Sequence, residues 1–127
     1  MTKFRSIAPT FVVSDVGDTA RWYRDNLGFE ASVFPKSPPY SFASLSHDGI
    51  EIMLLGLAGY RKPDTSRLRP EGLWDAYIRI RGVQEFYEEV RAKIAVRSEL
   101  VKRPYGDWEF EVRDPNGYVL VFGELTD

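Results

Sequence analysis

The 127-residue chain contains no cysteine and a single histidine, His47. The absence of cysteine excludes disulfides, thiolate metal sites and cysteine nucleophiles, and it is compatible with a reducing cytoplasm, where we expect the protein to be located. No apolar run approaches the roughly 20 residues of a membrane-spanning helix, and the first residues lack the apolar core of a signal peptide. We therefore expect a protein that is neither exported nor associated with a membrane.

An excess of charge of one sign is also missing. The chain has 17 basic and 19 acidic residues, which give a formal net charge of −2. Because nucleic-acid binding usually requires a strongly basic surface, we expect no nucleic-acid partner.

What the sequence does contain is one pattern of predicted elements that occurs twice. The first copy begins with an apolar, β-branched run, followed by a helix that starts after Asp15 and ends at Gly28. Asp48-Gly49 suits a tight hairpin turn between two later strands. The strands predicted for this copy are residues 6–13, 29–35, 40–46 and 50–56.

The second copy repeats this order. A helix is predicted over residues 83–94, with Val83, Tyr87 and Val90 on one face, and the turn Asp114–Gly117 precedes the last strand. Its strands are predicted over residues 74–81, 98–104, 107–113 and 118–123. The repeat predicts one domain, residues 1–127, with module one over 1–56, a linker over 57–73 and module two over 74–127. The linker is either a lid over a ligand site or a plain connector.

Three segments resemble a known family: APTFVVSDVGDTARWYRDNLGFE, IRGVQEFYEEV and RPYGDWEFEVRDPNGYVLVFGE. In this order and spacing they are similar to the vicinal oxygen chelate superfamily, which includes glyoxalases, bleomycin resistance proteins and extradiol dioxygenases. The resemblance implies an α+β fold of two βαβββ modules in tandem. Their curled mixed sheets would surround a cleft, with the helices on the outer face, commonly in a homodimer.

Metal-dependent members of this superfamily place ligands at the start of the first strand and midway along the last strand of each module. On this chain these positions are Ala8, Met53, Asp75 and Val121. Only Asp75 offers a donor suited to a divalent cation, and one carboxylate does not complete a coordination sphere. We therefore expect no metal and no other cofactor. The alternative is a metal-dependent glyoxalase- or dioxygenase-like enzyme in which Glu51 or Glu124 joins Asp75.

The alternation of strand side chains predicts which residues would line the cleft. Uniformly apolar sets, such as Ile52 with Leu54 and Phe110 with Val112, are expected to pack under the helices. The mixed sets and nearby aromatic residues are expected to face a ligand. The predicted ligand-binding residues are Phe34, Tyr40, Phe42, Glu51, Met53, Tyr77, Arg79, Tyr105, Trp108, Glu109 and Glu111. Phe42 and Trp108 are equally compatible with a place in the core.

No residue is assigned a catalytic role. His47 lies beside a predicted turn, which favours a solvated loop residue over a ligand or proton shuttle. Glu109 and Glu111 share a strand face and could act as acid and base, but ion pairs with Arg79 and Arg113 are the favoured interpretation.

Without a metal, the chain is most similar to the bleomycin resistance branch, whose members sequester an antibiotic in clefts between two subunits. In that branch a proline near the position of Pro9 directs an N-terminal strand to the partner subunit. The resemblance thus implies a homodimer that binds a small aromatic or amphipathic molecule without metal.

Overall fold

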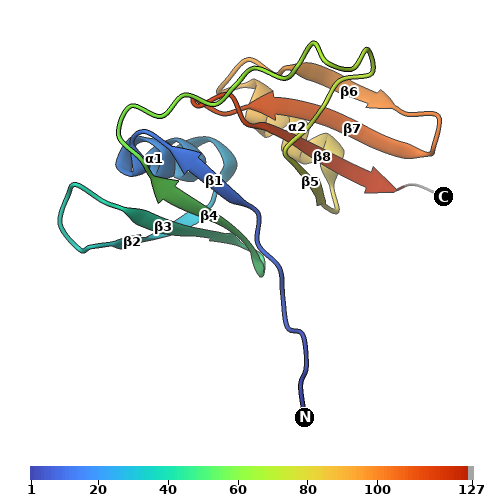
Figure 1. Ribbon diagram of the computed structural model, residues 1–127. Helices are drawn as coiled ribbons and strands as arrows, with labels where there is room; N and C mark the ends of the chain where they lie inside the picture. Colours follow the sequence, from blue (N-terminus) through green and yellow to red (C-terminus); the bar gives the residue numbers. More distant parts are fainter. Residues whose placement is uncertain (126–127) are drawn as a thin grey trace. The chain divides into compact units, whose positions relative to one another are not determined.

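The computed structural model describes residues 1–125, which form two units of the same topology (Figure 1). One unit comprises Met1–Arg61 and the other begins at Lys62. Each has a four-stranded mixed sheet and one helix in the order βαβββ. The α+β fold of two βαβββ modules expected from the sequence is confirmed.

Sheet A, in the first unit, has the strand order β1-β4-β3-β2. The parallel pair joins β1 and β4, and the other neighbours are antiparallel. Helix α1 packs on one face, where Tyr23, Leu45 and Leu54 are completely buried. The elements are β1 (Thr10–Val13), α1 (Val16–Leu27), β2 (Glu30–Phe34), β3 (Phe42–His47) and β4 (Ile50–Gly56).

Local sequence signals set the ends of these elements. The Asp15 carboxylate accepts a hydrogen bond from the Asp18 backbone N–H at 2.9 Å, and Gly28 ends α1 with φ 76°. Asp48 and Gly49 both have positive φ, 47° and 83°, as a two-residue hairpin turn requires. The predicted cap residues and turn are therefore confirmed.

Strand β1 begins later than predicted, at Thr10 instead of residue 6. The Pro9 carbonyl accepts from the Met53 N–H at 2.9 Å, but proline itself has no N–H to donate to the ladder. The residues before it leave the sheet as an extended arm (Figure 1), on which Phe4 and Ile7 are almost fully exposed.

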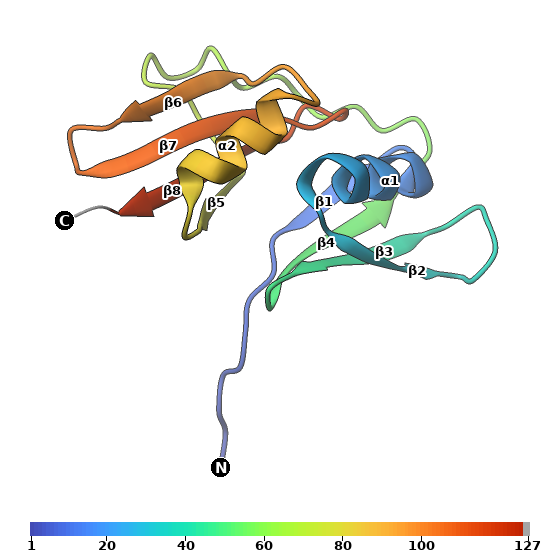
Figure 2. The same ribbon diagram turned by 180° about the vertical axis from the view of Figure 1, so that it is seen from behind.

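Sheet B, in the second unit, has the equivalent order β5-β8-β7-β6. Helix α2 packs on one face (Figure 2): the Phe86 ring lies 5.0 Å from Phe122, and the Tyr87 ring lies 5.2 Å from Phe110. The elements are β5 (Ala76–Arg79), α2 (Val83–Arg91), β6 (Ser98–Lys102), β7 (Asp107–Arg113) and β8 (Val119–Leu125).

The second unit also contains the chain that precedes β5. Residues from Lys62 to β5 pass across the face of sheet B opposite α2 (Figures 1 and 2). The Lys62 ammonium lies 3.8 Å from the Asp75 carboxylate and 5.4 Å from the centre of the Tyr118 ring. Most of the predicted linker therefore packs on the second sheet. Within residues 1–125, neither helix has the length and hydropathy to cross a bilayer.

Candidate functional site

The face of sheet A opposite α1 holds four of the predicted ligand-binding residues. Residues paired directly across neighbouring strands point to the same face, so the register arranges them in rows. The apolar row consists of Val12, Leu55, Phe42 and Phe34. The serine row consists of Thr10, Met53, Ser44 and Ser32, and the acidic row consists of Glu51, Ser46 and Glu30.

The apolar row is accessible although its side chains are large. Phe34 is 64% exposed and Leu55 is 43% exposed, whereas Phe42 and Val12 are half-buried. Apolar side chains that lie side by side and remain exposed are typical of binding surfaces.

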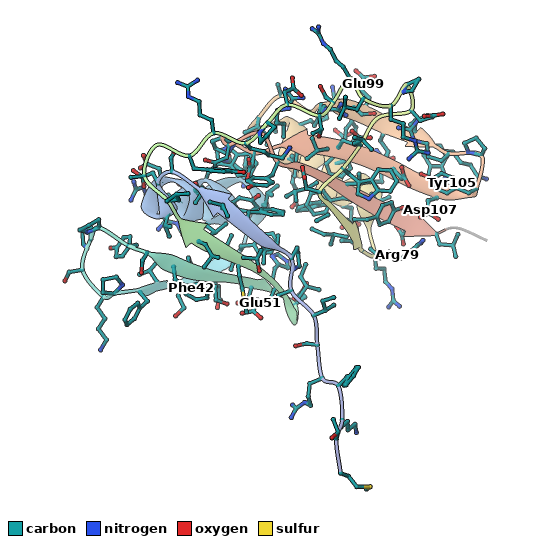
Figure 3. All side chains as sticks on the ribbon, in the orientation of Figure 1. Phe42, Glu51, Arg79, Glu99, Tyr105 and Asp107 are labelled. Carbon is teal, nitrogen blue, oxygen red and sulfur yellow. The ribbon has the colours of Figure 1, made fainter. Side chains whose placement is uncertain are left out.

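The acidic row has no cationic partner among residues 1–125. The Ser44 hydroxyl donates to the half-buried Glu51 carboxylate, and Glu30 is exposed. Among residues 1–125, no cationic side chain forms an ion pair with Glu30 or Glu51. Figure 3 shows Phe42 and Glu51 on the side of sheet A that faces away from α1.

The corresponding face of sheet B carries a network of paired charges. Asp107, Glu109 and Glu111 alternate along β7 on this face and are buried, Glu109 with only 1% exposure. Each has an arginine partner: Arg79 lies 2.9 Å from Asp107, Arg103 lies 3.3 Å from Glu109, and Arg97 pairs with Glu111. The ion pairs expected for Glu109 and Glu111 are thus present, but with Arg103 and Arg97 instead of Arg79 and Arg113.

Two tyrosine hydroxyls complete this network. The Tyr77 hydroxyl lies between the Asp107 and Glu109 carboxylates, 2.6 Å from the latter, and the Tyr105 hydroxyl donates to Glu109. Burial and these hydrogen bonds raise the pKa of Tyr77 well above its ordinary value. The same causes raise the pKa of Tyr105 to about 12. Both phenols therefore remain protonated donors at neutral pH.

Gly123 allows the Tyr77 side chain to cross β8. A Cβ atom at Gly123 would overlap the Tyr77 hydroxyl and ring carbons. Figure 3 shows Arg79, Tyr105 and Asp107 at one end of sheet B, where these groups meet.

The face of each sheet opposite its helix is called its open face, although residues from Lys62 to β5 cross that of sheet B. Two predicted ligand-binding residues lie away from both open faces. Trp108 alternates with Glu109 along β7 and thus shares the helix side of sheet B with Phe110. The Tyr40 ring lies beside Gly17 at the start of α1, within 3.3 Å of where a Cβ on that glycine would be.

The carboxylates proposed for a metal site have other partners. Asp75 accepts from the Val119 N–H at 2.8 Å, next to Lys62. Glu124 accepts from the N–H groups of Gly82 and Val83 at 3.1 and 3.0 Å and caps α2, whose N-cap glycine has no side chain. Val119, which holds Asp75, and Glu124 lie at opposite ends of β8, about 16 Å apart by strand rise. Within residues 1–125 no group of three or more histidine, aspartate or glutamate side chains is arranged so that it could hold a metal ion.

His47 is more constrained than a solvated loop residue. Its Nδ1 lies 2.8 Å from the Gly28 carbonyl oxygen, and its ring contacts Phe29 edge-on at 5.5 Å. His47 thus fastens the β3–β4 hairpin to the end of α1, although its side chain is 39% exposed.

Several site residues were not among the predicted ligand-binding residues. Strand alternation does place Leu55 on the same face as Glu51 and Met53, and it could also have placed Asp107, which precedes Glu109 at a spacing of two. Arg97, Arg103 and Gly123 act through contacts between different strands, and no local pattern marks them.

Comparisons with known proteins agree with this architecture. The model of the family described as the Glyoxalase/Bleomycin resistance protein/Dioxygenase superfamily matches residues 6–122. No curated protein sequence is similar enough to match the chain.

Solved structures include several with the same fold. A glyoxalase-related enzyme from Clostridium phytofermentans is 15% identical with a TM-score of 0.75, covering 98% of both chains. TioX from Micromonospora sp. ML1 is 18% identical with a TM-score of 0.76, covering 97% of this chain and 100% of its own. The bleomycin-binding protein of Streptomyces verticillus, solved with copper(II)-bleomycin, is 20% identical with a TM-score of 0.72, covering 100% of both chains.

Proposed function

The chain belongs to the Glyoxalase/Bleomycin resistance protein/Dioxygenase superfamily, and from this premise we propose that it binds and sequesters a small aromatic or amphipathic molecule without a metal ion. Its ligand would be held on the open face of sheet A. The bleomycin-binding protein among the structural neighbours supports a small-molecule ligand.

The observation that carries this proposal is the exposed apolar row of sheet A. Phe34, Phe42 and Leu55 offer aromatic and aliphatic contact area that no other described side chain fully covers. An aromatic ligand would gain about 0.5–1.5 kcal/mol per ring contact beyond the burial of apolar area. Sheet B is a poorer surface for a ligand, because its polar groups already satisfy one another.

The donor set supports metal independence. Met53 and Val121 stand where an oxygen or nitrogen ligand would be needed, and Asp75 and Glu124 are committed to backbone N–H groups. A hard divalent cation requires several oxygen or imidazole donors that converge at one point.

We also propose that the protein is a cytoplasmic homodimer in which the arm before Pro9 packs on the partner subunit. Phe4 and Ile7, almost fully exposed in one chain, would be buried by that contact. A second copy would also supply the enclosure that small-molecule sites usually have.

A ligand screen tests the proposed function. Thermal unfolding would be followed with bleomycins, quinones and other planar metabolites, and separately with Mn²⁺, Ni²⁺ and Zn²⁺. We expect an organic ligand to raise the melting temperature of the wild type but not of Phe42→Ala, since only binding to the folded state stabilises it. Stabilisation by a stoichiometric metal ion would favour the glyoxalase- or dioxygenase-like enzyme.

Antibiotic sequestration is tested in cells. Expression of the wild type in a sensitive bacterium should raise the inhibitory concentration of the compound that the screen identifies, whereas Phe42→Ala should not. Equal protection by both proteins would show that resistance does not depend on ligand binding at the open face of sheet A.

A further inference from the structure

We infer that the ligand of the sheet A face is an amphipathic amine, with its apolar group on the apolar row and one cationic nitrogen at the acidic row. This inference rests on the proposed function and names the class of ligand. Phe42 and Glu51, which Figure 3 labels on this face, belong to the two rows that define it.

The register fixes the distance between the two ends of such a ligand. Leu55 and Glu51 are four residues apart on β4, as are Phe42 and Ser46 on β3. Four residues of strand span about 13 Å, so the cationic nitrogen should lie at that distance from the centre of the apolar group.

The serine row leaves room for the part of the ligand between its ends. Ser44 and Ser32 are small, and Met53 is flexible and apolar, so a methylene chain can pass over them.

The charge of the ligand follows from a contrast within the molecule. Every buried carboxylate on the open face of sheet B has an arginine partner, whereas Glu30 and Glu51 have none among residues 1–125. Glu51 is half-buried, so its charge is partly desolvated and a cation brought beside it is attracted more strongly than in water. The acidic row therefore favours a cation and disfavours an anion of the same shape.

A matched series of compounds tests this inference. Phenyloctylamine, phenyloctanol and phenyloctanoic acid share one apolar group and chain, and differ only in the terminal group. Measured by titration calorimetry below their micellar concentrations, the amine should bind about tenfold more tightly than the alcohol, and the acid most weakly. Phenylethylamine and phenylethanol, too short to reach from the apolar row to the acidic row, should bind with nearly equal affinity.

Matched variants locate the effect. Glu51→Gln should weaken the binding of phenyloctylamine about fivefold, and Glu30→Gln with Glu51→Gln should remove its advantage over the alcohol. Glu99→Gln, on an exposed carboxylate of β6, is the control and should leave the affinity unchanged. Phe42→Ala should weaken all three long compounds alike, because it removes the contact that they share.

The inference is overturned if phenyloctanol binds as tightly as phenyloctylamine, if the Glu51 variant keeps full preference for the amine, or if none of the series binds. The first two results would leave the proposed small-molecule function intact. Failure of that function would instead appear as an absence of stabilisation by any compound in the wider screen.

Discussion

The two modules share a topology but present opposite chemistry on their open faces. In sheet A the row across the four strands is Val12, Leu55, Phe42 and Phe34; in sheet B the equivalent row is Arg79, Gly123, Glu109 and Val101. The topology therefore determines where each side chain stands, and the residue type decides what it can bind.

The polar groups on the open face of sheet B pair with one another, whereas those on the open face of sheet A leave interactions available to a ligand. On sheet B the three carboxylates of β7 are buried and pair with three arginines and two tyrosine hydroxyls, so a ligand would have to break existing ion pairs. On sheet A, exposed apolar side chains and carboxylates with no cationic partner among residues 1–125 leave interactions available. We therefore expect substitutions on sheet B to change stability, whereas those on sheet A change binding.

The largest effect is expected for Gly123→Ala. The new methyl group would occupy the position of the Tyr77 hydroxyl and displace the ring from Asp107 and Glu109. We expect a loss of about 2–4 kcal/mol in the free energy of unfolding, measured by urea denaturation. The substitution should cost much less in a Tyr77→Ala background, and Leu55→Ala, at the equivalent position of sheet A, should cost about 1 kcal/mol or less. An equal loss in the free energy of unfolding for Gly123→Ala and Leu55→Ala would contradict the proposed difference between the two sheets.

Glu109→Gln should have the next largest effect. The amide keeps the shape of the side chain but removes the charge that pairs with Arg103, which then has only Glu111 at 3.8 Å, and it replaces one of the two acceptor oxygens by a donor. A loss of about 2 kcal/mol in the free energy of unfolding is expected. The matched variant Glu51→Gln should stay within about 0.5 kcal/mol of the wild type. If Glu51→Gln were the more destabilising of the two, sheet A would carry the structural network.

A smaller effect is expected from alkaline pH. The raised pKa of Tyr105, about 12, means that the folded protein holds this phenolic proton more tightly than the unfolded chain does. The resulting stabilisation is complete below the ordinary phenol pKa of about 10 and is lost as pH rises through the folded value. As the pH is raised from about 10 to about 12, the urea concentration at the midpoint of unfolding should therefore decrease. In Tyr105→Phe this decrease should be smaller. Tyr60→Phe is the control, since no carboxylate among residues 1–125 accepts from its hydroxyl; an unchanged slope in Tyr105→Phe would show that other groups control the alkaline transition.

Much of the fold could be predicted because its signals are local. Asp15 and Gly28 end α1 through contacts within a few residues, and the Asp48-Gly49 turn needs only its own backbone conformation. Strand alternation likewise separates Glu109 and Glu111 from Phe110 without knowledge of the rest of the chain.

The missing part of the site depends on contacts between distant segments. Glu124 caps α2 at Gly82, 42 residues away, and Tyr77 reaches Glu109, 32 residues away, only because Gly123 has no side chain. Which arginine meets which carboxylate is decided by strand order and by the irregular β6–β7 register. Such pairings depend on the assembled sheet. Strand alternation therefore predicted the polar face, but it could not predict that Glu109 and Glu111 pair with Arg103 and Arg97.

The smallest change in stability is expected for Phe34→Ser, on the apolar row of sheet A. Phe34 is 64% exposed at the end of edge strand β2, so its burial contributes little to the stability of the fold. Serine is compatible with this face of β2, because Ser32 already occupies it two residues earlier. The free energy of unfolding should change by less than about 0.5 kcal/mol in urea denaturation, while the affinity for the ligand found by screening falls. A large loss of stability with unchanged affinity would mean that the apolar row supports the fold. Because serine removes the aromatic ring without altering the register of β2 and β3, the two outcomes distinguish a surface kept for binding from one kept for packing.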